Sequence, residues 1–215
     1  MGAALLTPAE AAVIAGVSLR DINRVIDEKI LPAGFTTVGD GRRIQLAACP
    51  LVGFYFRAAK ALTAEERLLL ILRFAERITG DMADHPFAGW STADWTVHDG
   101  FLSVSLSGFV AEADDRSTRL AAARAMVVED PAILSGTPVL RGTRIPLYDL
   151  VASVAAGLPR ERIFAAYPGL NATALDLATL YAEANPVRGR PRRFTVLPPG
   201  ATITAERTVP RRRRA

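Results

Sequence analysis

Residues 7–29, TPAEAAVIAGVSLRDINRVIDEK, contain the clearest helix signals in the first part of the chain. The opening residues TPAE place a threonine at a helix N-cap, a proline at the first helical position and a glutamate at the third, which together form a capping box. Gly16 ends this helix because glycine adopts the left-handed conformation of a helix C-terminus without steric penalty. Ser18 then caps a second helix, Leu19–Lys29, whose apolar side chains recur at helical spacing. The stretch therefore predicts two helices joined by a short turn.

A hairpin is predicted after the second helix. Two short strand-like runs, Phe35–Val38 and Arg42–Leu46, flank the turn Gly39-Asp40-Gly41. The first 60 residues resemble the MerR-type winged helix-turn-helix, through AEAAVIAGVSLRDINRVID and the hairpin sequence GDGRRI. The resemblance implies that Leu19–Lys29 is a DNA-recognition helix. A helical hairpin of another function is the alternative.

The resemblance also assigns candidate DNA-binding side chains. Leucine and isoleucine of the second helix would face the core, whereas its polar side chains would face the groove. Arginine can bridge guanine acceptors or phosphates, and asparagine can pair with adenine. The candidates are Ser18, Arg20, Asn23, Arg24, Arg42 and Arg43. For the arginines, a solvated helix face is the competing interpretation.

The middle of the chain predicts an apolar helix, a hairpin and a further helix. TAEE at residues 63–66 is a second capping box, which opens a helix running to Thr79. Apolar side chains between Leu68 and Ile78 wrap most of this helix, so it is either a central core helix or a dimer contact. The segments that follow are a linker over residues 81–92, a hairpin around His98-Asp99-Gly100 and a helix over Ala111–Ala125.

The last third of the chain carries its most specific motif, SGTPVLRGTRIP at residues 135–146. Glycines and prolines fix turns there, and three helices are predicted after it, the third over Ala172–Ala184. Residues 127–184 closely resemble the domain of unknown function 433 family. The resemblance implies a compact helix-turn-helix-like domain of three helices. Members are commonly VapB-like antitoxins encoded beside a PIN-like ribonuclease toxin.

The charge of the third helix argues against a second DNA-binding site. It contains Asp176 and Glu183 and neither lysine nor arginine, so phosphates would repel it. We therefore expect this domain to dimerise or to bind a protein partner. A homodimer or higher oligomer with two-fold symmetry would present paired recognition helices to an inverted repeat in operator DNA.

The chain ends in a strongly basic segment. From Arg188 onward nine arginines accompany one acidic residue, whereas residues 1–187 hold 17 basic and 21 acidic side chains. Few core residues and many prolines predict a segment that is disordered alone and seeks an anionic partner. In the antitoxin interpretation its arginines enter the acidic metal site of the nuclease and a phenylalanine anchors it. The candidate toxin-binding residues are Arg188, Arg190, Arg192, Arg193 and Phe194. An AT-hook, suggested by RGRP, and a solubilising tail are the alternatives.

Composition excludes other classes of protein. No apolar run approaches the roughly 18 residues of a membrane span, and the N-terminus lacks a signal-peptide pattern, so a cytoplasmic protein is expected. A single cysteine, Cys49, excludes disulfide frameworks and cysteine-based zinc sites, and no metal or cofactor is expected. Turns and helix starts explain the remaining acidic and imidazole cluster better than acid–base catalysis does, so we expect no enzyme; the cluster is Asp94, His98, Asp99, Asp114 and Asp115.

The sequence thus predicts a mainly α fold with small β-hairpins, in four parts. These are a winged helix-turn-helix domain (1–80), a linker with hairpin and helix (81–126), the family 433 domain (127–186) and the basic tail (187–215). The predicted function is that of a type II antitoxin, which neutralises a PIN-like ribonuclease toxin and represses its own operon by binding DNA. A stand-alone transcriptional regulator with an AT-hook-like tail is the alternative.

Overall fold

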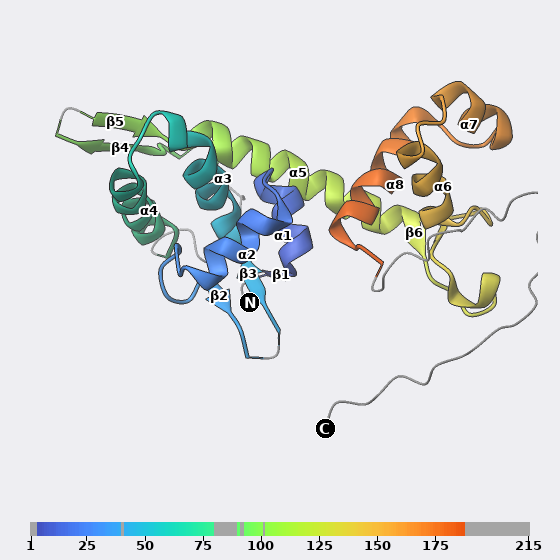
Figure 1. Ribbon diagram of the computed structural model, residues 1–215, viewed down its shortest axis with the longest axis horizontal. Helices are drawn as coiled ribbons and strands as arrows, with labels where there is room; N and C mark the ends of the chain where they lie inside the picture. The colour runs from blue at the N-terminus through green and yellow to red at the C-terminus, as the bar shows by residue number, and fades with distance from the viewer. Residues whose placement is uncertain (1–3, 40, 80–89, 91–92, 101, 188–215) are drawn as a thin grey trace, which may run out of the picture.

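The protein is mainly helical and carries small antiparallel sheets (Figure 1). The computed structural model describes residues 4–39, 41–79, 90, 93–100 and 102–187. A long helix, α5 (Ser107–Met126), runs from a group of elements formed by the first part of the chain to a second group formed by the last part. Each group has its own hydrophobic core.

The first two helices begin where the capping signals predict. Helix α1 (Pro8–Ala15) carries the complete capping box, in which the Glu10 carboxylate accepts a hydrogen bond from the Thr7 N–H at 2.7 Å. The turn after α1 passes through Gly16, whose φ is +67°. Helix α2 (Leu19–Asp27) starts at the Ser18 cap but ends two residues earlier than predicted. It ends there because the chain turns at Lys29, where φ is +52°.

A three-stranded antiparallel sheet lies beside these helices. The predicted hairpin is present as β2 (Thr36–Thr37) and β3 (Arg43–Gln45), both shorter than expected. The sequence did not reveal β1 (Leu5–Leu6), which pairs with the other side of β3. Two residues are too few to show an alternating pattern, so β1 is recognised as a strand only by its pairing with β3.

A buried helix that sequence patterns did not indicate forms the centre of the first core. Helix α3 (Cys49–Arg57) follows the 3₁₀ turn Leu46–Ala48 and precedes a second one, Ala58–Lys60. Its residues from Cys49 to Tyr55 are all buried, so it lacks the polar face that reveals an amphipathic helix. A Cβ at Gly53 would lie 2.9 Å from the carbonyl oxygen of Ala15, which shows how closely α3 crosses α1.

Helix α4 (Ala64–Thr79) packs one side on this core and leaves an apolar strip uncovered. Leu70, Ile71, Phe74 and Ile78 are buried. The strip of Leu68, Leu69 and Leu72 is 37%, 40% and 50% exposed. The helix is therefore a core helix that also presents leucines on its outer side.

The predicted hairpin after α4 is present as β4 (Thr96–Asp99) and β5 (Leu102–Ser105). Most of the predicted linker, residues 81–89 and 91–92, lies outside the described residues. Trp90 is buried, and its carbonyl accepts a hydrogen bond from the Trp95 indole N–H at 2.7 Å. Both tryptophans belong to the first core, together with Val110 of α5. The region expected to connect two domains therefore contributes to the core of the first group.

The last part of the chain forms the second group. The two-stranded sheet β6 (Val127–Val128) and β7 (Val139–Leu140) precedes the three predicted helices. These helices are α6 (Leu147–Ala155), α7 (Arg160–Ala166) and α8 (Ala172–Ala184). Helix α8 packs against α6, and it also packs against α5 and α1. Its last residue, Ala184, is buried in the first core, so α8 ties the two groups together.

Candidate nucleic-acid interface

The outer face of α2 is the candidate interface. Ile22, Val25 and Ile26 point into the core, and this orients the polar side chains of the helix outward. Ser18, Arg20, Asn23 and Arg24 line one open polar depression over the helix, together with the acidic residues Asp21, Asp27 and Glu28. The structure therefore brings together the four candidates predicted on this helix.

One side chain of α2 does not point where the sequence predicted. Leu19 was expected to face the core, but it is 44% exposed. It lines an open pocket with Pro186, which follows the end of α8. The prediction was wrong because α2 begins beside the second group of elements, and sequence periodicity within one helix carries no information about that neighbour.

Arg24 is paired with an acidic residue of its own helix. Its Nε donates to both carboxylate oxygens of Glu28, at 2.9 and 3.0 Å. These hydrogen bonds and the charge of Glu28 raise the pKa of Arg24. Both side chains are 53% exposed, so water and salt screen the pair, and it adds little to stability. Arg24 can therefore exchange Glu28 for an anion of a partner at small cost.

Arg42 connects the β2–β3 hairpin to α2. Its guanidinium donates to the Asp27 carboxylate at 2.8 Å and to the Asn23 side-chain oxygen at 2.9 Å. The Asn23 amide nitrogen in turn donates to the Leu19 carbonyl at 3.0 Å. Each end of the Asn23 carboxamide thus has one partner, and these two contacts fix its orientation. A second N–H group and a second oxygen lone pair are left for a further hydrogen bond.

Arg20 and Arg43 differ from the other two arginines. Across residues 4–39, 41–79, 90, 93–100 and 102–187, neither has a hydrogen-bond or ion-pair partner. Ser18, by contrast, is used locally, since its hydroxyl donates to the Asp21 carboxylate at 2.7 Å and caps α2. Among the described residues, the candidates thus comprise two cations without a partner, two paired cations, the hydrogen-bonded amide of Asn23 and the cap Ser18.

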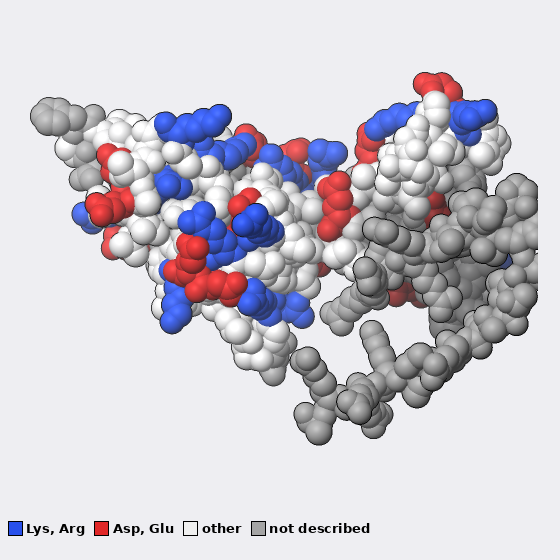
Figure 2. Space-filling model, viewed as in Figure 1, with Lys and Arg blue, Asp and Glu red and all other residues white. Residues whose placement is uncertain are grey.

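The charge of this surface is nearly balanced. Residues 18–45 hold five basic and four acidic side chains. Figure 2 shows blue and red side chains intermixed over α2. Because phosphate contacts supply most of the affinity of a protein for DNA, one surplus positive charge gives only weak attraction. Tight binding by this face requires cations from another part of the protein.

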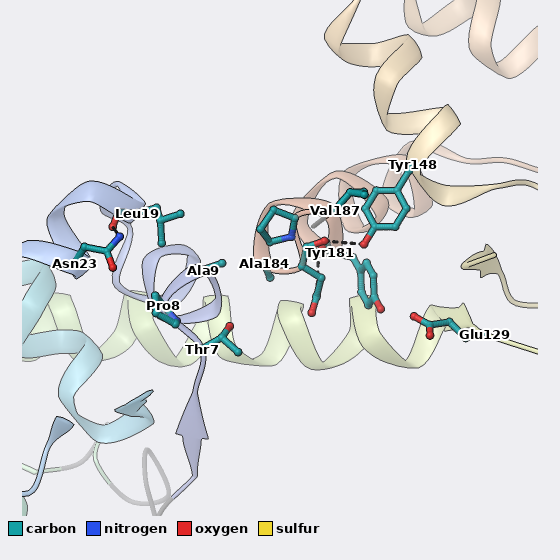
Figure 3. Close-up of a pocket in the computed structure, with 12 residues that line it drawn as sticks. Thr7, Pro8, Ala9, Leu19, Asn23, Glu129, Tyr148, Tyr181, Ala184 and Val187 are labelled. Carbon is teal, nitrogen blue, oxygen red and sulfur yellow. Dashed lines mark hydrogen bonds between the residues drawn. The ribbon is translucent and has the colours of Figure 1, made fainter. Parts of the chain in front are cut away.

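The candidate toxin-binding residues Arg188, Arg190, Arg192, Arg193 and Phe194 lie outside the described residues. The chain leading to them is described. The Tyr148 hydroxyl donates to the Asn185 carbonyl at 2.6 Å, and Val187 lines a pocket with Leu19 and Asn23 (Figure 3). Sequence reasoning missed this neighbourhood, because no local pattern records which helix the end of α8 will meet.

One member of the acidic and imidazole cluster, Asp94, makes a turn contact. The Asp94 carboxylate accepts the Thr96 N–H at 2.9 Å, and hydrogen bonds from Thr96 lower the pKa of Asp94. Within the described ranges, no group of three histidine, cysteine or acidic residues is arranged to hold a metal ion. Burial raises the pKa of the Cys49 thiol, which keeps it protonated.

The described part of the chain contains no helix with the length and apolarity that crossing a bilayer demands.

Comparison with known proteins assigns the second group of elements to a domain class. Residues 127–182 match the family described as protein of unknown function DUF433. Over the whole chain, an uncharacterized protein named y4eO from Sinorhizobium fredii (strain NBRC 101917 / NGR234) is 50% identical over 212 residues. The alignment covers 99% of this chain and 96% of the relative. The chain therefore belongs to the family of y4eO and carries a DUF433 domain at its C-terminal end. No solved structure matches it.

Proposed function

We propose that this protein binds operator DNA through a winged helix-turn-helix made of α1, α2 and the β2–β3 hairpin, and represses its own operon. The observation that carries the proposal is the outer face of α2, where Arg20 on the first turn has no partner among the described residues and Arg42 holds the hairpin against the helix. In helix-turn-helix proteins the first turns of the second helix meet the base edges. An α-helix with its side chains is about 10–12 Å in diameter, which suits a major groove about 12 Å wide.

A binding assay with matched DNA tests this proposal. The probes are a duplex from the region upstream of the protein's own reading frame and a shuffled duplex of equal length and composition. We expect tighter binding to the upstream duplex. The double variant Arg20→Ala/Arg24→Ala should weaken binding and reduce its dependence on salt. Equal affinity for both duplexes would argue against operator recognition.

The second part of the proposal is that the protein is an antitoxin for a PIN-like ribonuclease. It rests on the resemblance of residues 127–184 to family members that are commonly VapB-like antitoxins; the match to the family itself covers residues 127–182. Helix α8 suits a protein partner better than DNA, because it carries Asp176 and Glu183 and no basic residue. The arginines of the tail would form charge-assisted hydrogen bonds with the carboxylates that hold the nuclease metal.

Co-expression with the neighbouring reading frame tests the antitoxin function. We expect the two proteins to co-purify and the full chain to inhibit ribonuclease activity. Truncation after Pro186 should remove this inhibition while the DUF433 domain remains folded. If no small acidic reading frame adjoins the gene, the alternative of a stand-alone regulator with an AT-hook-like tail is favoured instead.

A homodimer fits both parts of the proposal. Two copies related by a two-fold axis would present two α2 helices to the half-sites of an inverted repeat. The exposed leucine strip of α4 offers an apolar surface for such a contact.

A further inference from the structure

We propose that the basic tail, residues 187–215, binds the same DNA duplex as α2 and contacts the phosphates next to the recognition helix. This inference rests on the DNA-binding function proposed above and names the part of the chain that completes that interface.

The end of α8 is fixed in position. Ala184 is 2% exposed and packs within the first core, against the group of elements that includes α2. The next residue, Asn185, accepts a hydrogen bond from the Tyr148 hydroxyl at 2.6 Å and donates its side-chain N–H to the Tyr181 carbonyl at 3.0 Å. Contacts from α1, α5 and α6 thus hold the place where the tail begins.

That place lies beside the first turn of α2. Pro186 and Leu19 line one pocket together, and Val187 lines a neighbouring pocket with Leu19 and Asn23. Figure 3 shows the end of α8 facing Leu19 and Asn23 across this pocket. Leu19 and Asn23 flank Arg20 on α2. The fold therefore starts the tail at the end of α2 that approaches the bases in helix-turn-helix complexes.

The charge distribution favours contact between the tail and DNA. Residues 1–187 carry four more acidic than basic side chains, and the sequence of α2 and its hairpin, residues 18–45, has a surplus of one positive charge. From Arg188 onward the surplus is eight. A body of negative net charge is repelled by DNA, whereas an arginine-rich segment attached beside α2 reverses that repulsion next to the recognition helix.

The length of the segment suits nearby phosphates. An extended chain spans about 3.3–3.6 Å per residue, so Arg188–Arg193 reaches about 20 Å from the anchor. The four arginines in this stretch, which we call the proximal block, are Arg188, Arg190, Arg192 and Arg193. The four of the distal block, Arg211–Arg214, begin 23 residues after Arg188. The effective concentration of a tethered group falls with tether length, so the proximal block should contribute more.

Site-directed DNA cleavage tests the geometry. We would attach an iron–EDTA reagent to Val187→Cys in the full chain, since Val187 is 63% exposed whereas the natural Cys49 is buried. The probe is the duplex upstream of the reading frame. We expect cleavage at nucleotides bordering the footprint of α2. The same reagent on Ala165→Cys, an exposed position of α7, should give no cleavage.

Salt dependence tests the charge argument. Replacing the proximal block by glutamine should lower the slope of log K against log salt by up to about 3.6, at about 0.9 for each phosphate that the protein no longer neutralises. The matched change in the distal block removes the same charge and should have a smaller effect. Equal effects of both blocks would show a general charge effect and overturn the proposed anchoring.

The two levels of proposal fail separately. If Val187→Cys gives no cleavage while the protein still binds the duplex, the tail does not contact that DNA. A protein partner is then the remaining ligand for the tail. If Arg20→Ala leaves binding unchanged while the tail variants abolish it, α2 is not the reader. That result removes the proposed recognition helix and, with it, the shared duplex.

Discussion

Arg20→Ala is the substitution that most directly tests the candidate interface. Arg20 lies on the first turn of α2, is exposed and has no hydrogen-bond or ion-pair partner among the described residues. The variant therefore removes one cation without leaving an acidic partner unpaired. Arg24→Ala would be harder to interpret, because it releases the carboxylate of Glu28 on the same surface.

The expected magnitude follows from counterion release. Removing one phosphate-neutralising side chain lowers the slope of log K against log salt by about 0.9. The same relation gives a reduction in affinity of about eightfold at 0.1 M salt and about fourfold at 0.2 M. A phosphate-binding side chain strengthens binding to operator and shuffled DNA alike. A side chain that reads a base edge adds an effect that is confined to the operator.

Fluorescence anisotropy with a labelled duplex across a salt series measures both quantities. Arg162→Ala is the matched control, since Arg162 is also exposed and helical but lies on α7. It changes the net charge equally and should leave affinity and slope near those of the parent protein. Wild-type binding by Arg20→Ala, or an equal reduction in Arg162→Ala, would refute the assignment of α2 as the recognition helix.

Three further predictions concern stability and assembly. Gly16→Ala should lower the free energy of unfolding, measured by urea denaturation, by at least about 1 kcal/mol, because φ there is +67° and a Cβ would lie 2.6 Å from the Arg116 guanidinium. The control Gly108→Ala should leave the free energy of unfolding unchanged, since no atom lies within 4 Å of the Cβ it adds. A hydrogen bond from Arg57 lowers the pKa of Glu112, so the Glu112 carboxylate stabilises the fold above about pH 4.5 and loses this effect as the pH falls further. Glu112→Gln should therefore flatten the dependence of the free energy of unfolding on pH in this range, and an unchanged dependence would contradict the argument. If the α4 strip forms the proposed dimer contact, Leu69→Glu should convert a dimer to a monomer in light scattering with an unchanged circular dichroism spectrum, whereas a persisting dimer would place the contact elsewhere.

Local signals made the elements of the first helices predictable. The capping box at Thr7, the cap at Ser18 and the left-handed glycine at position 16 act within a few residues, so they can be recognised without knowledge of the fold. The same holds for the β4–β5 hairpin and the three helices of the DUF433 domain. Helix α3 escaped prediction because it has no side-chain N-cap and is buried over most of its length.

The candidate interface was predictable only in part. Periodicity correctly placed Arg20, Asn23 and Arg24 on one outer face of α2. It could not indicate that Arg42 would reach back to Asn23 and Asp27, because the hairpin carries it there across 15 to 19 residues of sequence. Leu19 was misplaced for a similar reason, since its neighbour Pro186 is distant in the chain.

Local sequence signals are sufficient to place the starts of the helices and the polar face of α2, and a residue count shows that positive charge is concentrated after residue 187. These properties depend on neighbours within a turn of helix or on simple counting. The packing of α8 across α5 and α1, and its end beside the first turn of α2, follow from long-range contacts instead. The proximity of the end of α8 to α2 depends on the burial of Ala184 in a core formed by residues that are distant in the sequence. It joins the basic end of the chain to the surface proposed to read DNA.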